Sequence, residues 1–323
     1  MNIAGHFHTV VPRLRYAFSP VPEPPSAEWA LEIADSKLGT VRLSGRLSRC
    51  EAAGDRLLLL VHGLGGCSES PYMTRAARAA LAAGFDVLRI NLRGSDRRGE
   101  DYYHAGLGED LRRVLACQDL AAYDHLYVLG YSIGGHVSLR MATEACDPRL
   151  HSVAAVCAPL DLAPCARHID RASRVVYRTY LLNGLRSIYA AVAERREVPI
   201  DPAEARKIRF LREWDDRVVA PRHGFAGADD YYARASVGPR LGDLTVPALL
   251  VLSEDDPMIP ATALEERLAD RPAALTVRRV AIGGHLGFPK AVNLGLGHLP
   301  AESSTGGGPE VIEEQILGWL ATV

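Results

Sequence analysis

A serine inside a glycine-rich turn is the feature that most constrains what this chain can fold into. Residues 130–135 (GYSIGG) follow the apolar run 126–129 (LYVL) and precede a helical pattern. This is a GxSxG motif in the strand–turn–helix setting that it requires, with Ser132 at its centre. Small residues two positions before and after the serine allow a tight turn, which strains the serine backbone and projects its Oγ above the sheet edge. Chance matches to so short a pattern occur in glycine-rich chains, but the flanking strand and helix favour a nucleophilic serine.

Short apolar runs alternate with longer amphipathic stretches on both sides of this motif. Apolar runs that are separated by helical patterns predict parallel strands with helices covering both faces of the sheet. Two earlier runs, residues 29–33 and 41–47, predict an antiparallel hairpin that opens the fold. Strands are expected at residues 56–61, 85–91, 125–131, 151–157, 246–252 and 275–281, and helices at 71–83, 108–117, 133–144, from 261 onward and at 309–320.

The alternation breaks between residues 159 and 244. Leu181, Leu185, Ile188 and Val192 recur there at helical spacing, and no strand-like run interrupts them. We therefore expect a helical cap inserted at residues 159–229, in a core formed by residues 1–158 and 230–323. Because such an insertion leaves from the carboxyl ends of the strands, its apolar stripe should partly pack on the core and partly line a pocket over the serine.

A nucleophilic serine needs a general base, and that base needs an acid to orient it. In proteins with this motif, the acid and then the histidine follow the serine along the chain. His285 comes just after the expected strand 275–281, where a loop can carry it over Ser132. The alternative is His298, in the Gly/Ser-rich residues 294–308, which is more simply interpreted as an exposed loop histidine. We therefore assign the base to His285.

The acid should come directly after the strand at residues 246–252. Residues 253–257 (SEDDP) supply a cluster of carboxylates at this place. The usual pattern after such a strand is a small residue, an acid, any residue and an aspartate, followed by an aliphatic residue and a proline. With Ser253 as the small residue and Pro260 as the proline, this pattern favours Asp256 and leaves Asp255 as the alternative. Either aspartate could instead cap the helix that is expected from residue 261.

The reaction also needs two N–H donors for the oxyanion. Ile133, the residue after the serine, supplies one. The other should come from residues 62–66 (HGLGG), which follow the strand at 56–61, and Leu64 is the residue that we favour. His62 precedes the serine along the chain and is expected to fix this loop through hydrogen bonds. A phosphate-binding loop is disfavoured because GxxxxGK[ST] is absent.

These motifs resemble those of the α/β-hydrolase superfamily, and more narrowly its YheT-type group of predicted esterases and hydrolases. The resemblance implies a mostly parallel, eight-stranded sheet flanked by helices, with a helical cap. It departs after Phe288, where a long Gly-rich segment follows. The narrower similarity is carried by residues 5–12 (GHFHTVVP), 61–66 (VHGLGG), 69–72 (ESPY), 91–94 (NLRG), 103–106 (YHAG) and 284–288 (GHLGF).

The expected function is a serine esterase that cleaves carboxylic esters through a Ser132–His285–Asp256 triad and an acyl-enzyme. The resemblance implies short- to medium-chain acyl or lipid-like esters as substrates. The chemistry requires no metal and no organic cofactor. One alternative is acyl transfer to an alcohol by the same acyl-enzyme. Another is a non-catalytic binding protein of the same fold, which would be expected to have lost the serine, the histidine or the glycines of the turn; all are present.

Charge and cysteine usage exclude several classes of function. The 37 basic and 39 acidic residues give a net charge of −2, so the chain as a whole is not attracted to nucleic acid. The six cysteines include no CxxC pair, which disfavours zinc and favours reduced thiols. No apolar run approaches the roughly 20 residues of a membrane-spanning helix, and the N-terminus lacks the apolar core of a signal peptide. We therefore expect a cytoplasmic protein.

Arginines recur along the expected cap. A solvated helix face is the more common reason for such a pattern. The alternative is weak contact with a membrane surface, because amphipathic helices with basic polar faces lie on anionic lipid. The arginines concerned are Arg167, Arg171, Arg174, Arg178, Arg186, Arg195 and Arg196.

Overall fold

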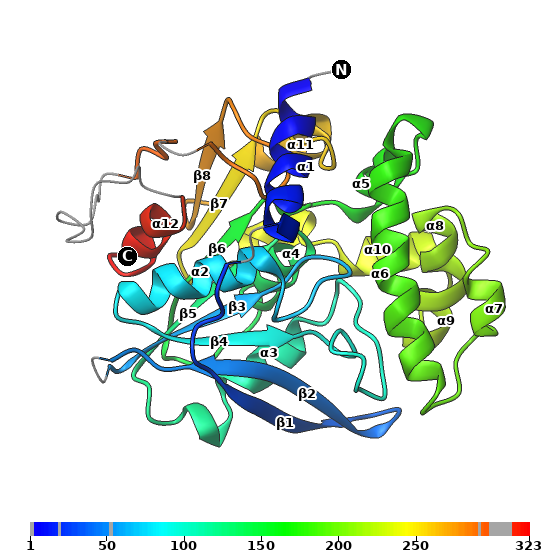
Figure 1. Cartoon of the computed structure of the whole chain (residues 1–323), viewed down its shortest axis with the longest axis horizontal. Coiled ribbons are helices and arrows are strands. Elements are labelled where there is room, and N and C mark those ends of the chain that lie inside the picture. The colour runs from blue at the N-terminus through cyan, green and yellow to red at the C-terminus, as the bar shows by residue number, and fades with distance from the viewer. Residues whose placement is uncertain (1–2, 19–20, 52–53, 290–291, 297–311) are drawn as a thin grey trace.

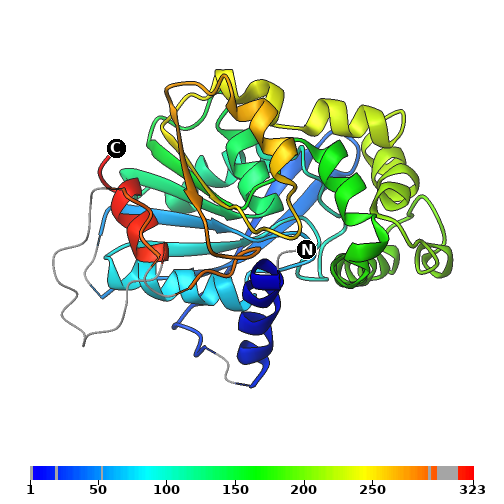
Figure 2. The same ribbon diagram turned by 90° about the horizontal axis from the view of Figure 1, so that it is seen from above.

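The computed structural model contains one eight-stranded sheet with helices on both faces (Figures 1 and 2). It describes residues 3–18, 21–51, 54–289, 292–296 and 312–323. The strand order is β1-β2-β4-β3-β5-β6-β7-β8, in which β1 and β2 pair with their neighbours antiparallel and the other strands run parallel. The strands are β1 (Ala27–Asp35), β2 (Gly39–Ser48), β3 (Arg56–Val61), β4 (Asp86–Asn91), β5 (His125–Tyr131), β6 (Leu150–Val156), β7 (Ala248–Ser253) and β8 (Leu275–Val280).

Alternate residues of the central strands point to opposite faces of the sheet, and both faces are buried. In β3, Leu57 and Leu59 pack in one hydrophobic cluster while Leu58 and Leu60 pack in the other. The first cluster is covered by α3 (Gly108–Leu115), α4 (Ile133–Met141) and α11 (Ala261–Leu268), the second by α2 (Pro71–Ala82) and α12 (Ile312–Leu320). The predicted fold class is confirmed, and the expected strands and helices differ from the observed ones by a few residues at their ends.

The N-terminal helix α1 (Ile3–Phe18) was not predicted from the sequence. Its first turn carries no acidic residue, and proline at position 12 is unfavourable in the interior of a helix. Tertiary contacts with loops far along the chain therefore account for a helix that local pattern does not favour.

Between β6 and β7 the chain forms helices joined by loops and contains no strand, and every residue of this stretch is described. These inserted helices lie beside the sheet, at the right of Figure 1. The proposed cap boundaries at residues 159 and 229 stay a prediction, and the last inserted helix extends beyond the second boundary. The inserted helices are α5 (Leu162–Ile169), α6 (Val175–Ala193), α7 (Pro202–Ala205), α8 (Leu211–Trp214), α9 (Ala220–His223) and α10 (Ala228–Ala235).

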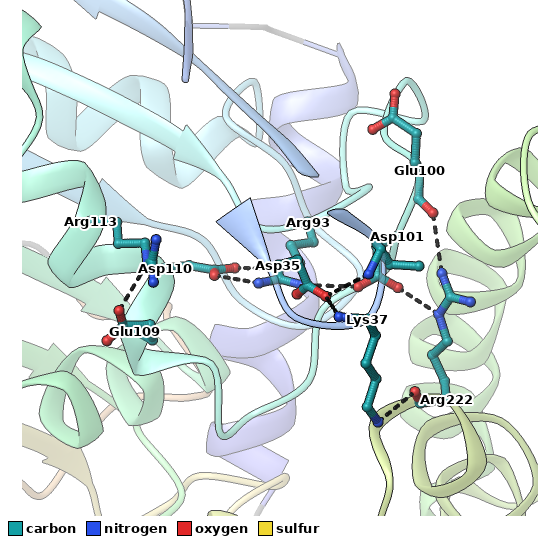
Figure 3. Close-up of polar contacts among 10 residues, drawn as sticks. Asp35, Lys37, Arg93, Glu100, Asp101, Glu109, Asp110, Arg113 and Arg222 are labelled. Atoms are coloured by element: carbon teal, nitrogen blue, oxygen red, sulfur yellow. Dashed lines mark hydrogen bonds and ion pairs between the residues drawn. The ribbon is translucent and has the colours of Figure 1, made fainter. Parts of the chain in front are cut away.

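A buried arginine connects the sheet to the inserted helices (Figure 3). Arg93, just after β4, donates to both carboxylate oxygens of Asp110 in α3 at 2.7 Å. Its Nη1 donates to Asp35 at 2.7 Å and to Asp101 at 3.1 Å. Asp101 also accepts from Arg222 of α9 at 2.9 Å. Burial opposes ionisation of Asp35, but the hydrogen bond from Arg93 prevails and lowers its pKa to about 2. The loop that contains Asp101 is thereby fixed to the sheet through Arg93 and to the inserted helices through Arg222.

None of the helices in the described part of the chain combines the length and the apolar character that crossing a membrane requires.

Candidate active site

Ser132 lies at the sharp turn between β5 and α4, in a backbone conformation that serine rarely adopts. Its φ is 53° and its ψ is −121°. A Cβ on Gly130 would lie 2.5 Å from the Gly134 carbonyl oxygen, and one on Gly134 would lie 2.4 Å from the His62 carbonyl oxygen. The two glycines of the motif are therefore required by close backbone contacts. The Ser132 N–H donates to the Val156 carbonyl at 2.8 Å, which anchors the turn to β6.

Three of the sequence-predicted residues come together at the carboxyl ends of the strands. His285 Nε2 lies 2.8 Å from Ser132 Oγ, and His285 Nδ1 lies 2.8 Å from Asp256 Oδ2. The other oxygen of Asp256 accepts from the N–H groups of Met258 at 2.7 Å and Ile259 at 3.1 Å. Because the Asp256 carboxylate can only accept a hydrogen bond from the ring, Nδ1 of His285 must carry the ring proton. Nε2 is then free to accept the proton of the serine hydroxyl.

The alternative acid, Asp255, does not enter this arrangement. The carboxylate that contacts His285 is that of Asp256, and Asp255 supplies a backbone surface on which α1 packs. His298 lies outside the residues that the structure describes.

Backbone strain is concentrated around these side chains. Among the described residues, the non-glycine residues with positive φ are Arg97, Ser132, Cys157 and Leu286. Leu286 adjoins His285, and the sulfur of Cys157 lies within 4.8 Å of ligand atoms of Asp256 and His285. Such conformations cost roughly 1–3 kcal/mol each and gather at functional sites. Burial raises the pKa of the Cys157 thiol well above its usual range, so the thiol stays protonated.

The loop after β3 leaves one backbone donor unused. The Gly63 N–H donates to the Tyr72 hydroxyl at 2.8 Å, and the Gly65 N–H donates to the Tyr103 hydroxyl at 2.7 Å. The N–H of Leu64, between them, meets no acceptor among the described residues. Two tyrosines thus hold the neighbouring amides and leave this one available.

The amide of Ile133, the first residue of α4, likewise has no acceptor in the described part of the chain. The first N–H groups of a helix have no intrahelical partner and carry the positive end of its dipole. Ile133 and Leu64 both line the cavity that contains Ser132.

His62 fixes the same loop, as the sequence suggests. Its Nε2 accepts from the Leu92 N–H at 3.1 Å and from the Ser95 hydroxyl at 2.8 Å. Nδ1 therefore carries the proton and donates to the Gly63 carbonyl at 2.8 Å. Complete burial lowers the pKa of His62 to about 4, so the ring is neutral near pH 7.

Two cavities meet at Ser132. One, of about 910 Å³, lies between the sheet and the inserted helices and is largely apolar; Leu181, Leu185 and Ile188 of α6 line it. Val192 is instead fully buried in the core. The apolar stripe of α6 therefore partly lines the cavity and partly packs on the core, as expected from the sequence. The other cavity, of about 1610 Å³, lies between α1, α2 and α6 and includes His285. Both volumes are partly open to solvent.

Residues that sequence reasoning missed hold the loops of the candidate site. Tyr72 and Tyr103 lie 9 and 38 positions from the glycines whose amides they accept, and no local pattern marks this pairing. Their only signal was membership in the short segments 69–72 and 103–106 that carry the family resemblance.

Comparison with known proteins adds independent findings. A family model described as "alpha/beta hydrolase fold" matches residues 56–291. The chain is 30% identical to "Putative esterase YheT" of Escherichia coli (strain K12) over 294 residues, which cover 88% of this chain and 84% of that protein. It is 25% identical to human "Phospholipase ABHD3" over 73% of this chain and 59% of that protein. It is also 24% identical to "Monoacylglycerol lipase" of Saccharomyces cerevisiae over 72% and 55%. The chain thus matches less than two thirds of the length of the last two.

Solved structures share the fold. The 2,6-dihydroxy-pseudo-oxynicotine hydrolase aligns with a TM-score of 0.51 at 17% identity, over 86% of this chain and 67% of that one. The α/β hydrolase GrgF from Penicillium sp. sh18 aligns with a TM-score of 0.50 at 16% identity, over 80% and 91%. At these identities the likeness concerns the fold alone.

Proposed function

Because this chain belongs to the α/β-hydrolase family, in its YheT-type group, we propose that it hydrolyses carboxylic esters with Ser132 as the nucleophile. The observation that carries the proposal is the continuous hydrogen-bonded path from Ser132 Oγ through His285 to Asp256, with both links at 2.8 Å. All three side chains are buried, which keeps water from competing for these hydrogen bonds. Relatives named as esterase and lipase support hydrolytic chemistry.

The proposed reaction proceeds through an acyl-enzyme. His285 Nε2 takes the hydroxyl proton as Ser132 Oγ attacks the carbonyl carbon, and Asp256 stabilises the resulting imidazolium. The N–H groups of Leu64 and Ile133 donate to the oxyanion. Collapse of the tetrahedral intermediate expels the alcohol, which receives the proton from His285. Water then gives a proton to His285 and attacks the acyl carbon, and collapse of the second intermediate releases the acid and restores Ser132.

We further propose an acyl group of short to medium length or a lipid-like ester. The apolar cavity under α6 suits the acyl chain, because each buried CH₂ contributes about 0.8 kcal/mol. Exposed apolar side chains line the second cavity, on α1 (Val10, 37% exposed) and on α6 (Val176, 69%, and Tyr180, 41%). Such side chains suit an ester presented with other lipids.

Acyl transfer to an alcohol is the second candidate. The observation that favours it is the size of the second cavity, which reaches Ser132 and could hold an acceptor alcohol in place of water. Product analysis in the presence of a competing alcohol separates the two reactions. Free acid as the main product supports hydrolysis, and a new ester as the main product supports transfer.

The test of the nucleophile is labelling by a fluorophosphonate probe together with turnover of p-nitrophenyl esters. We expect Ser132→Ala to remove labelling and to leave only the residual acceleration of roughly 10³–10⁴ over water that oxyanion stabilisation and binding provide. Ser187→Ala, on the exposed side of α6, is the matched control and should behave as wild type. Normal turnover by Ser132→Ala would overturn the proposal, whereas a wild type with neither labelling nor turnover would favour the binding-protein alternative.

A further inference from the structure

Residues 5–12 carry part of the family resemblance, but the proposed reaction gives them no role. They lie in α1, which Figures 1 and 2 show against the loops that follow the last strands of the sheet. Three residues of this helix, Gly5, His6 and Thr9, make contacts that bear on the site.

Thr9 holds the backbone of the proposed general base. The His285 N–H donates to Thr9 Oγ1 at 2.8 Å, across 276 positions of sequence. The Thr9 hydroxyl in turn donates to the Gly5 carbonyl at 2.7 Å. Because the hydroxyl both accepts and donates, its orientation is fixed, and it directs a lone pair at the His285 amide.

Glycines allow the helix to lie directly on both catalytic loops. A Cβ on Gly5 would lie 1.8 Å from the carbonyl oxygen of Asp255, the neighbour of Asp256. A Cβ on Gly284, the neighbour of His285, would lie 2.5 Å from the Gly5 carbonyl oxygen and 2.6 Å from the Thr9 nitrogen. No side chain fits between the helix and the two loops, so a movement of α1 is transmitted to them.

The loop that carries His285 needs such a support. Its Gly284 N–H donates to the Gly287 carbonyl at 2.7 Å, and Leu286 within this tight turn has a φ of 65°. A non-glycine residue in the left-handed region costs roughly 1–2 kcal/mol, which favours relaxation of the turn. The Thr9 hydroxyl opposes that relaxation at the residue that must keep its imidazole aligned.

The same helix contacts the inserted helices. His6 Nδ1 lies 2.6 Å from the Tyr177 hydroxyl of α6, and Arg174 Nη1 lies 2.9 Å from His6 Nε2. The ring of His6 stacks on that of Tyr177 with centroids 5.6 Å apart. The helix is thus held both by the loops that carry Asp256 and His285 and by the inserted helices.

We propose that Thr9 is a positioning residue for His285 and that α1 acts through it on the catalytic step. The inference rests on the proposed function, because it takes His285 as the general base. Thr9 touches no reacting atom; it fixes the turn that presents Nε2 to Ser132 Oγ. A displacement of about 1 Å in such a group can reduce the rate roughly 100-fold.

The test uses Thr9→Val, which keeps the shape and removes both hydrogen bonds, and Thr9→Ser, which keeps the hydroxyl. We expect Thr9→Val to lower kcat by about 10- to 100-fold while KM stays within about twofold. The rate of fluorophosphonate labelling should fall by the same factor, and the low-field proton NMR signal of the His285–Asp256 hydrogen bond should weaken. Thr9→Ser should restore all of these. Val11→Ala, on an exposed position of the same helix, is the control and should match wild type.

Other outcomes overturn the inference. Wild-type kcat in Thr9→Val would do so, and so would an equal loss in Thr9→Val and Thr9→Ser, since that loss would come from packing. If Thr9→Val does not fold, Thr9→Ala replaces it, with the same expected loss in kcat. Failure of the proposed function is separate, because it appears as normal turnover in Ser132→Ala. Full dependence on Ser132 and His285 with no effect at Thr9 refutes the positioning role alone.

Discussion

Gly65 and Gly184 are in direct backbone contact. Gly65 lies in the loop after β3 with a φ of 72°, and Gly184 lies within α6; a Cβ built on Gly184 would be 2.8 Å from the Gly65 Cα. The inserted helix therefore rests on the loop that carries the Leu64 amide, with no side chain between them. The position of α6 and the position of a proposed oxyanion donor are fixed by the same contact.

Gly184→Ala should separate the helix from this loop. A methyl group has no room there, so either α6 or the loop must shift by several tenths of an ångström. We expect kcat/KM to fall by about 10-fold, mostly through kcat, because a misplaced N–H donor stabilises the oxyanion less. The control is Gly242→Ala, where a Cβ would meet nothing within 4 Å. Equal activity in both variants would show that the contact has no effect on the reaction.

Asp256→Asn tests the choice between neighbouring aspartates. An amide cannot hold the imidazole in the tautomer that accepts the serine proton, so kcat should fall by about 10⁴. Asp255→Asn should cost far less, since its carboxylate does not contact His285. The measurement is steady-state turnover of a p-nitrophenyl ester, and the reverse ranking would move the acid to Asp255.

Leu185→Trp should shorten the acyl cavity. Leu185 lines the apolar cavity beside Ser132, so a larger side chain there should lower kcat/KM for octanoate esters and spare acetate. Each CH₂ group that is excluded from the cavity forfeits about 0.8 kcal/mol. Val175→Trp, at an exposed position of the same helix, should leave the octanoate-to-acetate ratio unchanged. An unchanged ratio in Leu185→Trp at normal stability would remove this residue from the substrate site.

Asp215 predicts a pH dependence of stability. Burial raises its pKa from 3.8 to about 7, and a hydrogen bond from the Tyr232 hydroxyl at 2.6 Å offsets this only in part. Between about pH 4 and pH 7 the folded protein keeps a proton that the unfolded chain releases, so the free energy of unfolding falls as pH rises through this window.

Asp215→Asn should flatten that decline, because the amide cannot ionise. Urea unfolding of both proteins at pH 5 and pH 8 measures it. The wild type should lose more stability between the two values than the variant. Parallel losses would mean that Asp215 ionises in the folded protein as it does in the unfolded chain.

The sheet was predictable because its strands carry their own signal. Residues 56–61 and 125–131 are apolar on both faces, and strands β3 and β5 span the same ranges. The positions of Ser132 and His285 follow from a local motif and from chain order. From the sequence, only the register of the motif distinguishes Asp256 from Asp255. The contact between Asp256 and His285 is visible only in the structure.

The supports of the site were not predictable for a physical reason. Thr9, Tyr72 and Tyr103 act by accepting backbone N–H groups, an ability that any hydroxyl has. What selects these three is proximity created by the fold, as the 276 positions between Thr9 and His285 illustrate. Helix α1 was not predictable for the same reason, because it is stabilised by contacts with loops far along the chain rather than by a local sequence pattern.

The strained backbone at Ser132, Cys157 and Leu286 sets a limit on selection for heat resistance. Relief of strain at one such position would gain roughly 1–3 kcal/mol, a large share of the roughly 5–15 kcal/mol by which a typical domain stays folded. A library screened only for survival at high temperature should therefore enrich glycine at position 132, whereas glycine in place of the fully buried Cys157 would leave a cavity. Glycine at position 132 would produce a more stable protein that lacks the proposed nucleophile. Screens on this scaffold need a turnover readout at every round, because the most accessible stabilising substitutions lie where the chemistry is.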